Sequence, residues 1–179
     1  MSAKTEILGE VCEHLLAGDM RSAADVANTR YPFVPIVPAS RGYGEARCVA
    51  IFRRDGFTDR YSGEPLVFPG TLRLLSLLLP VQFPFQKNWR TAETHVMFWE
   101  LFPTLDHVVP VCRGGTDDDT NLVTTSMLRN SAKANWLLEE LGWELAAQRQ
   151  MSNWDGLVGW FMRFLAKDSS YLADTYVRR

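Results

Sequence analysis

The spacing of apolar residues predicts two helices at the N-terminal end of this chain. In residues 4–17 the apolar positions lie three or four residues apart, and the pattern ends at Gly18. Asp19 has a side chain suited to cap the next helix, which is rich in alanine and is expected to end near Asn28. The sequence therefore predicts a pair of short consecutive helices.

Further elements are predicted beyond a proline-rich connector. Residues 45–54 are compatible with either a helix or a strand, because so short a segment does not distinguish helical from strand periodicity. Helices are expected at residues 71–79, 89–102, 125–141 and 154–167. Strands are expected at residues 105–109 and 121–124. Strands and helices thus mix in one chain, which predicts an α+β protein.

Three prolines between residues 32 and 38 predict an extended segment that separates two regions. We therefore expect an N-terminal helical arm and connector at residues 1–38. A central core is expected at residues 39–143, with a helical insertion at about 66–103. Residues 144–179 are expected to form a C-terminal helical extension.

Composition favours an intracellular globular protein. Of the 179 residues, 46% are hydrophobic and 22% are charged, so the chain can bury a core of its own. Its three cysteines are odd in number and lack paired spacing, which argues against a disulfide framework. The apolar run at residues 72–81 is too short to cross a bilayer, and no signal pattern opens the sequence. We expect a cytoplasmic location and no membrane partner.

The richest chemical pattern lies between residues 105 and 135. Asp106 offers a hard oxygen ligand for Mg²⁺, and His107, beside it, can take a proton from water. A Gly-Gly pair follows at residues 114 and 115. Asn121 can accept a hydrogen bond from one ring nitrogen of His107. Asn130 can supply its amide oxygen as a second ligand of the ion that Asp106 binds. These groups are what metal-assisted phosphodiester hydrolysis requires.

This pattern resembles the HNH nucleases, whose ββα-metal fold holds one divalent cation between two strands and a helix. The resemblance implies that Asp106 and Asn130 are the metal ligands, that His107 is the general base and that Asn121 is the orienting asparagine. It extends upstream, because residues 52–57, which contain Arg54-Asp55-Gly56, are similar to an element that opens the family motif. The expected fold is an HNH core embedded in a mainly helical domain. The resemblance covers roughly residues 47–136.

The chain departs from the family at four positions. Many members carry two Cys-x-x-Cys pairs that hold a structural zinc. Here these positions are Asp59, Ser62, Ser126 and Arg129. No structural zinc is expected, and apolar packing by residues 66–103 is expected to supply the missing stability.

Several residues near the motif have both a functional and a structural interpretation. Arg113, Arg129 and Lys133 are candidates for contact with substrate phosphate. The alternative is a weak ion pair with the nearby aspartates for Arg113 and an ordinary surface position for Lys133. His95 is either a packing residue or, in the functional interpretation, a phosphate contact or an accessory ligand near the metal. The six tryptophans are expected to pack in the interior, with base stacking as the alternative.

The net charge of −2 is low for a protein that binds nucleic acid, so any basic surface has to be local. Arginines bracket the upstream element at Arg41, Arg47, Arg53, Arg54 and Arg60. Acidic residues gather elsewhere, for example at residues 117–119. We expect a polarised surface with salt-sensitive affinity for DNA.

The resemblance implies an endonuclease that hydrolyses DNA with one divalent cation, Mg²⁺ or Mn²⁺, and needs no small-molecule cofactor. Restriction or phage defence is the setting that family analogy suggests. A self-complementary recognition site would favour a homodimer. Two alternatives remain: a non-catalytic nucleic-acid-binding module, and an interaction subunit of a defence assembly that keeps the HNH fold.

Overall fold

The computed structural model describes residues 3–36 and 42–178. The chain divides into two compact units, residues 1–37 and 38–179. The predicted boundary at residue 38 lies outside the described residues, as does Arg41. Residues 144–179, the expected C-terminal helical extension, belong to the second unit. In the described residues, no helix is both long and apolar enough to cross a membrane.

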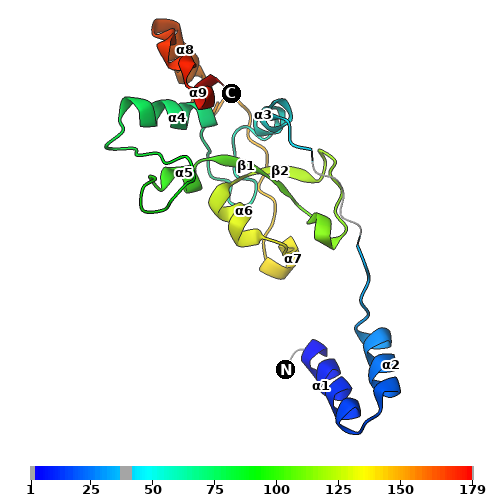
Figure 1. The fold of residues 1–179 in the computed structure, drawn as a ribbon. Coiled ribbons are helices and arrows are strands. Elements are labelled where there is room, and N and C mark those ends of the chain that lie inside the picture. The colour runs from blue at the N-terminus through cyan, green and yellow to red at the C-terminus, as the bar shows by residue number, and fades with distance from the viewer. Residues whose placement is uncertain (1–2, 37–41, 179) are drawn as a thin grey trace. The chain divides into compact units, whose positions relative to one another are not determined.

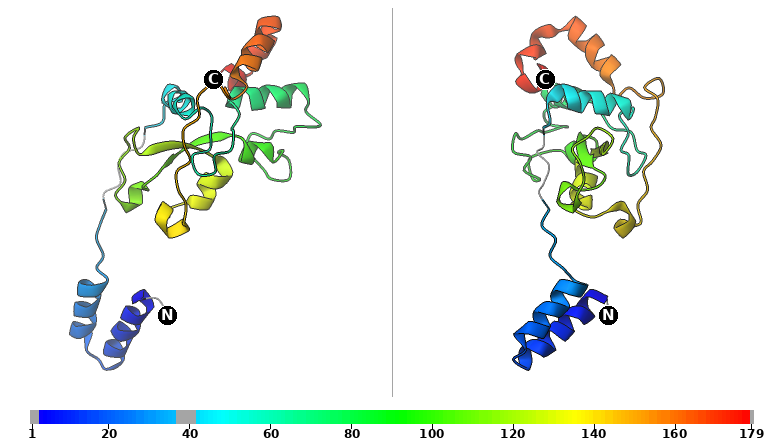
Figure 2. Two further views of the ribbon diagram at one scale, coloured as in Figure 1. Left: turned by 180° about the vertical axis from the view of Figure 1, so that it is seen from behind. Right: turned by 90° about the vertical axis from the view of Figure 1, so that its right-hand side faces the viewer.

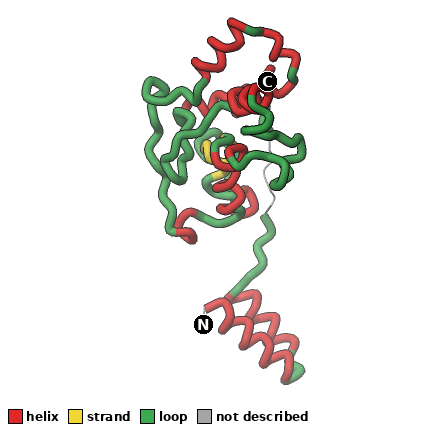
Figure 3. The backbone as a smooth tube through the Cα atoms, turned by 90° about the vertical axis from the view of Figure 1, so that its left-hand side faces the viewer, coloured by secondary structure: helices red, strands yellow, loops and turns green. Residues whose placement is uncertain are grey.

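The first unit is a hairpin of two helices, α1 (Ala3–Leu16) and α2 (Met20–Arg30), which confirms both predicted helices. Gly18 makes the turn with a positive φ of 75°, and the Asp19 carboxylate accepts a hydrogen bond from the Ser22 amide at 3.0 Å. An ion pair between Arg30 and Glu10 joins the two helices. Figure 3 shows the hairpin as two adjacent helical segments.

The second unit contains a two-stranded antiparallel sheet of β1 (Pro103–His107) and β2 (Leu122–Ser126). Asp106 lies opposite Val123 in this register, and His107 lies opposite Leu122. The connecting loop contains the short 3₁₀ helix η1 (Val111–Arg113), which ends at Gly114 with φ of +90°. Both predicted strands are present, so the protein is a mixed α and β chain.

Two helices lie on opposite sides of the strands (Figures 1 and 2). On one side is α3 (Glu45–Arg54), so the segment with two possible interpretations is a helix. On the other is α6 (Met127–Lys133), which starts directly after β2. The Ser126 hydroxyl caps α6 by accepting a hydrogen bond from the Arg129 amide at 3.2 Å. A β-β-α unit therefore sits at the centre of the second unit.

Two predicted helices are shorter than expected. The helix predicted at residues 125–141 ends at Lys133, because Ala134 has φ of +46°, and a separate turn, α7 (Leu138–Leu141), follows. The helix predicted at residues 89–102 is only α5 (Met97–Glu100). Trp89 has φ of +53°, which a helix excludes, and its ring packs 5.0 Å from that of Phe102. In both cases local backbone turns override the apolar spacing.

The remaining helices pack around the C-terminal part of the chain. They are α4 (Pro69–Leu78), α8 (Val158–Lys167), the 3₁₀ helix η2 (Ser169–Ala173) and α9 (Thr175–Arg178). The Pro69 ring opens α4, where its missing N–H costs nothing. Leu74, Phe161 and Val177 form a core between these helices. A second core around Leu72 and Phe98 continues toward the sheet.

Candidate functional site

The loop between β1 and β2 is closed by Asn121 and Gly115. The Asn121 side chain accepts a hydrogen bond from the Val109 amide at 2.9 Å, and it donates to the carbonyls of Val109 at 3.0 Å and Thr116 at 2.8 Å. A Cβ on Gly115 would lie 1.8 Å from the Val109 carbonyl oxygen, so only glycine fits. The predicted hydrogen bond from Asn121 to the His107 ring is therefore corrected, because Asn121 instead holds the loop that follows His107.

His107, the last residue of β1, is held by two partners that the sequence did not identify. Its Nε2 lies 2.9 Å from Asp117 Oδ1, and its Nδ1 lies 3.2 Å from the Tyr43 hydroxyl. Only 5% of the residue is exposed. Asp117 stands in an acidic run to which the sequence assigned no role at the site, and Tyr43 is 64 positions away from His107, so no local spacing indicated either residue.

Asp117 is in turn fixed by Arg47 of α3. The Arg47 guanidinium donates to Asp117 Oδ2 at 2.9 Å and to Asp119 Oδ1 at 2.8 Å. The hydrogen bond from Arg47, followed by that to His107, lowers the pKa of Asp117 to about 2. Asp117 is therefore ionised at neutral pH and supplies a negative charge beside the imidazole.

This arrangement predicts a stability loss in acid that depends on Asp117. Its folded pKa of about 2 lies below the ordinary aspartate value of 3.8, so the unfolded chain binds the proton first. The contribution is present above pH 3.8 and is lost as the pH falls through about 2. Urea unfolding of the native chain should therefore lose more stability between pH 5 and pH 2 than unfolding of Asp117→Asn. Parallel pH profiles for the two proteins would contradict this.

Asp106 faces the other side of β1, toward α6. Its Oδ2 accepts a hydrogen bond from the Tyr61 hydroxyl at 2.7 Å and lies 2.9 Å from the Lys133 ammonium. Burial and the negative charge of Asp106 raise the pKa of Tyr61 above its usual value, so the hydroxyl remains a donor. The two neighbouring side chains Asp106 and His107 thus point to opposite faces, as alternation on a strand dictates.

Lys133, the candidate for contact with substrate phosphate, lies in the interior of the second unit. Its side chain is fully buried, and its ammonium also donates to the carbonyl oxygen of His107 at 2.7 Å. The ammonium lies 5.7 Å from the centre of the Tyr61 ring as well. Lys133 is therefore an internal counterion of Asp106 that ties α6 to the end of β1.

Asn130 lies one turn before Lys133 and also faces β1. Its Nδ2 donates to Thr104 Oγ1 at 3.1 Å and to the Leu105 carbonyl at 3.0 Å. Because a backbone carbonyl only accepts, these bonds assign the amide nitrogen to the strand side. Within the described part of the chain, neither Asn130 Oδ1 nor Asp106 Oδ1 has a recorded hydrogen bond. Each of the two predicted metal ligands thus keeps one oxygen uncommitted.

Comparisons with family models, with curated proteins and with solved structures give no match for this chain. Among residues 3–36 and 42–178, no group of three His, Cys, Asp or Glu side chains is placed to hold a metal ion. The two uncommitted oxygens above come from one carboxylate and one amide.

Asp59, one of the four positions that resemble zinc-ligand positions, is the centre of a hydrogen-bond network. The buried carboxylate accepts from the Ser126 amide at 2.9 Å, the Thr125 hydroxyl at 3.1 Å and the Tyr61 amide at 2.9 Å. Arg129 Nε lies 3.9 Å from the same carboxylate. Apolar packing by residues 66–103 is present around Leu72 and Phe98, and a buried carboxylate in addition connects the segment at residues 59–62 to the start of α6.

We expect Asp59→Ala to lower the free energy of unfolding by about 2 kcal/mol, because it leaves the buried Ser126 amide without a hydrogen-bond acceptor. Urea denaturation measures this loss. Asp119→Ala is a suitable control, since Asp119 is an exposed partner of Arg47, and it should change stability by less than about 0.5 kcal/mol. Equal effects of the two substitutions would remove the structural role assigned to Asp59.

The Arg-Asp-Gly element lies along the outer edge of β2 and is held there by Asp55. This buried carboxylate accepts from the Thr124 amide at 2.8 Å and pairs with Arg54 at 2.9 Å and Arg60 at 3.2 Å. Burial alone would raise the pKa of Asp55, but the hydrogen bonds from Arg54 and Thr124 outweigh it and lower the pKa. The sequence pointed to this element through the resemblance without assigning Asp55 a role.

The expected basic surface is reduced by these internal pairs. Arg47, Arg54 and Arg60 all bind aspartates of the same unit. Arg113 pairs with Glu140 at 2.9 Å, and Arg129 lies over the Trp143 ring at 5.8 Å. The side chains of Arg113 and Arg129 nevertheless remain 40% and 43% exposed, so both stay accessible to a ligand.

His95 has the contacts of a packing residue. Its Nδ1 accepts a hydrogen bond from the Met97 amide at 3.2 Å, and its ring lies 5.2 Å from that of Phe83 in an edge-on arrangement. The alternative interpretation, contact with phosphate, gains no support from these bonds. His95 is therefore a useful control for substitutions of His107.

Proposed function

We propose that this protein is a divalent-metal-dependent endonuclease of the HNH type that hydrolyses DNA phosphodiester bonds. The observation that carries the proposal is the β-β-α unit, in which Asp106 and Asn130 each keep a side-chain oxygen uncommitted and His107 directly follows Asp106 in β1. The order Asp-His, Gly-Gly, Asn, Asn along the chain agrees with it.

The donor set fits a hard cation. Mg²⁺ prefers oxygen ligands, keeps several waters and is commonly held by one or two carboxylates together with substrate phosphate. Asp106 would supply one oxygen and Asn130 the other. When bound, such an ion would offset the negative charge that develops on the phosphate and on the leaving oxygen.

His107 is the residue proposed to accept the proton of the attacking water. A neutral imidazole has one nitrogen that accepts and one that donates, so the ring needs a partner for its N–H. Asp117, ionised at neutral pH, accepts that hydrogen bond at Nε2, which leaves Nδ1, now 3.2 Å from the Tyr43 hydroxyl, as the acceptor. Movement of Tyr43 would open this nitrogen to water.

Arg113 and Arg129 are the proposed contacts to DNA phosphates. Arg113 lies in the loop between β1 and β2 and Arg129 lies in α6, and both side chains remain partly exposed. The ion pair of Arg113 lies near the surface, where such a pair contributes little, and Arg129 Nε lies 3.9 Å from the Asp59 carboxylate. A homodimer on a self-complementary site and a role in restriction or phage defence are part of the same proposal.

Incubation of plasmid DNA with the full-length protein tests the activity. We expect nicked or linear DNA in Mg²⁺ or Mn²⁺ and none in excess EDTA, with 5′-phosphate ends. Sequencing the ends from modified and unmodified DNA would then separate a site-specific enzyme from a nonspecific one. No cleavage with any divalent ion would contradict the proposal.

A non-catalytic nucleic-acid-binding module is the second candidate, and two observations favour it. His107 is only 5% exposed, and the Lys133 ammonium already neutralises Asp106. DNA binding by gel shift without cleavage in any metal would support this candidate. Absence of both binding and cleavage would favour an interaction subunit of a larger defence assembly.

A further inference from the structure

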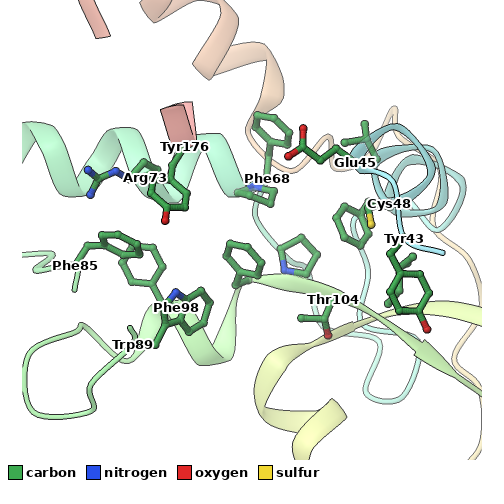
Figure 4. Close-up of a pocket in the computed structure, with 16 residues that line it drawn as sticks. Tyr43, Glu45, Cys48, Phe68, Arg73, Phe85, Trp89, Phe98, Thr104 and Tyr176 are labelled. Atoms are coloured by element: carbon green, nitrogen blue, oxygen red, sulfur yellow. The ribbon is translucent and has the colours of Figure 1, made fainter. Parts of the chain in front are cut away.

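A cavity of about 500 Å³ lies in the second unit between α3, α4, the loop before α5 and the first half of β1. Half of its sixteen lining residues are aromatic. Figure 4 shows Phe85, Trp89 and Phe98 at one end, Tyr43 at the other, and Phe68 above them. The volume is within the range of cavities that bind small organic groups, and the aromatic walls favour a flat ring.

The charges in the wall argue against an anionic ligand. Arg73 is paired with Asp174 at 2.6 Å, and its guanidinium lies 4.6 Å from the centre of the Phe85 ring. The same wall contains the carboxylate side chain of Glu45. A phosphate would therefore meet no uncompensated positive charge here. These charges favour an uncharged ring with polar edges as the ligand.

The cavity shares two side chains with the candidate catalytic site. Tyr43 lines the cavity and its hydroxyl lies 3.2 Å from His107 Nδ1. Thr104 also lines it, and its Oγ1 accepts a hydrogen bond from Asn130 at 3.1 Å. Only the Tyr43 side chain thus separates a group bound in the cavity from His107, and only the Thr104 side chain separates it from Asn130.

We propose that this cavity binds a nucleobase turned out of the DNA stack, next to the phosphodiester bond that is cut. The inference rests on the proposed nuclease function and names the part of the substrate that the protein would recognise. Aromatic side chains stack on any base, and the sugar-phosphate backbone would remain outside beside His107. Unstacking costs free energy and costs least for an unpaired base, so such a base should be preferred.

DNA binding without cleavage tests the cavity. Full-length protein in EDTA is titrated into two fluorescein-labelled duplexes that differ by one bulged adenine, and anisotropy gives the two dissociation constants. We expect the native protein to bind the bulged duplex about tenfold more tightly, the change that one base-aromatic stacking contact can give. Val49→Trp, which fills the cavity, and Phe85→Ala, which removes one wall, should abolish the preference.

Phe83→Ala is the matched control. Phe83 is in the same loop as Phe85 and packs against the same core, but it does not line the cavity. It should keep the tenfold preference, and thermal unfolding of all three variants shows which of them remain folded. Val49→Trp adds volume without removing a core contact. A loss of the preference in this variant is therefore attributed to the filled cavity and not to unfolding.

The outcomes separate this inference from the proposed function. If the native protein cleaves DNA but binds both duplexes equally, the base-binding inference fails and the nuclease proposal stands. If it prefers the bulged duplex and never cleaves, binding of an unstacked base in the cavity stands, while the nuclease proposal and the position of the base beside a cut bond fail. Retention of the preference in Val49→Trp and Phe85→Ala overturns the assignment of the cavity.

Discussion

His107→Ala is expected to lower the rate constant of plasmid cleavage by about 10²–10⁴-fold, the usual effect of removing a general base. The physical reason is that no other imidazole takes part in the β-β-α unit, so the attacking water loses its proton acceptor. Single-turnover cleavage in Mg²⁺ measures the rate, and a gel shift in EDTA measures DNA binding. Binding should change far less than cleavage.

His95→Ala provides the control for this substitution. Like His107 it is largely removed from solvent and hydrogen-bonded through a ring nitrogen, but its contacts are with the Met97 amide and the Phe83 ring. It should retain cleavage to within a few-fold, the range expected away from the reacting groups. Equal losses in both variants would mean that His107 acts through packing and would overturn its assignment as the base.

Lys133→Ala is expected to lower the free energy of unfolding by about 3–5 kcal/mol, because it leaves the Asp106 carboxylate in the interior without its counterion. The Lys133 side chain is fully buried and that of Asp106 is 12% exposed, so solvent compensates little. Urea denaturation at neutral pH measures the loss. The effect would be among the largest of any single substitution in this chain.

The double variant Lys133→Ala with Asp106→Asn shows whether charge is the cause. Removing both charges should restore a large part of the stability lost in Lys133→Ala, since no isolated carboxylate remains buried. Arg90→Ala is the exposed comparison, because Arg90 and Glu93 form a surface pair with both side chains more than half exposed. A loss below 1 kcal/mol in Lys133→Ala would contradict the internal role assigned to the lysine.

Sequence reasoning succeeded where short-range physics decides the structure. The cap at Asp19, the stop at Gly18 and the two strands on either side of the Gly-Gly turn are all present, because each depends on residues a few positions apart. It failed at residues 89–102 and 125–141, where apolar spacing predicted long helices. There the positive φ values of Trp89 and Ala134 break the backbone, and packing of distant aromatic rings accompanies the first break.

The sequence by itself determined the order of the Asp-His, Gly-Gly, Asn and Asn groups, and the helix and strand that carry them. Only the tertiary structure decided which atoms meet: His107 with Asp117 and Tyr43, Asp106 with Lys133 and Tyr61, and Asp59 with the amide that starts α6. These partners lie 10 to 67 positions apart. Pairing over such distances depends on how the elements pack, and the pattern of residues along the chain does not predict that packing.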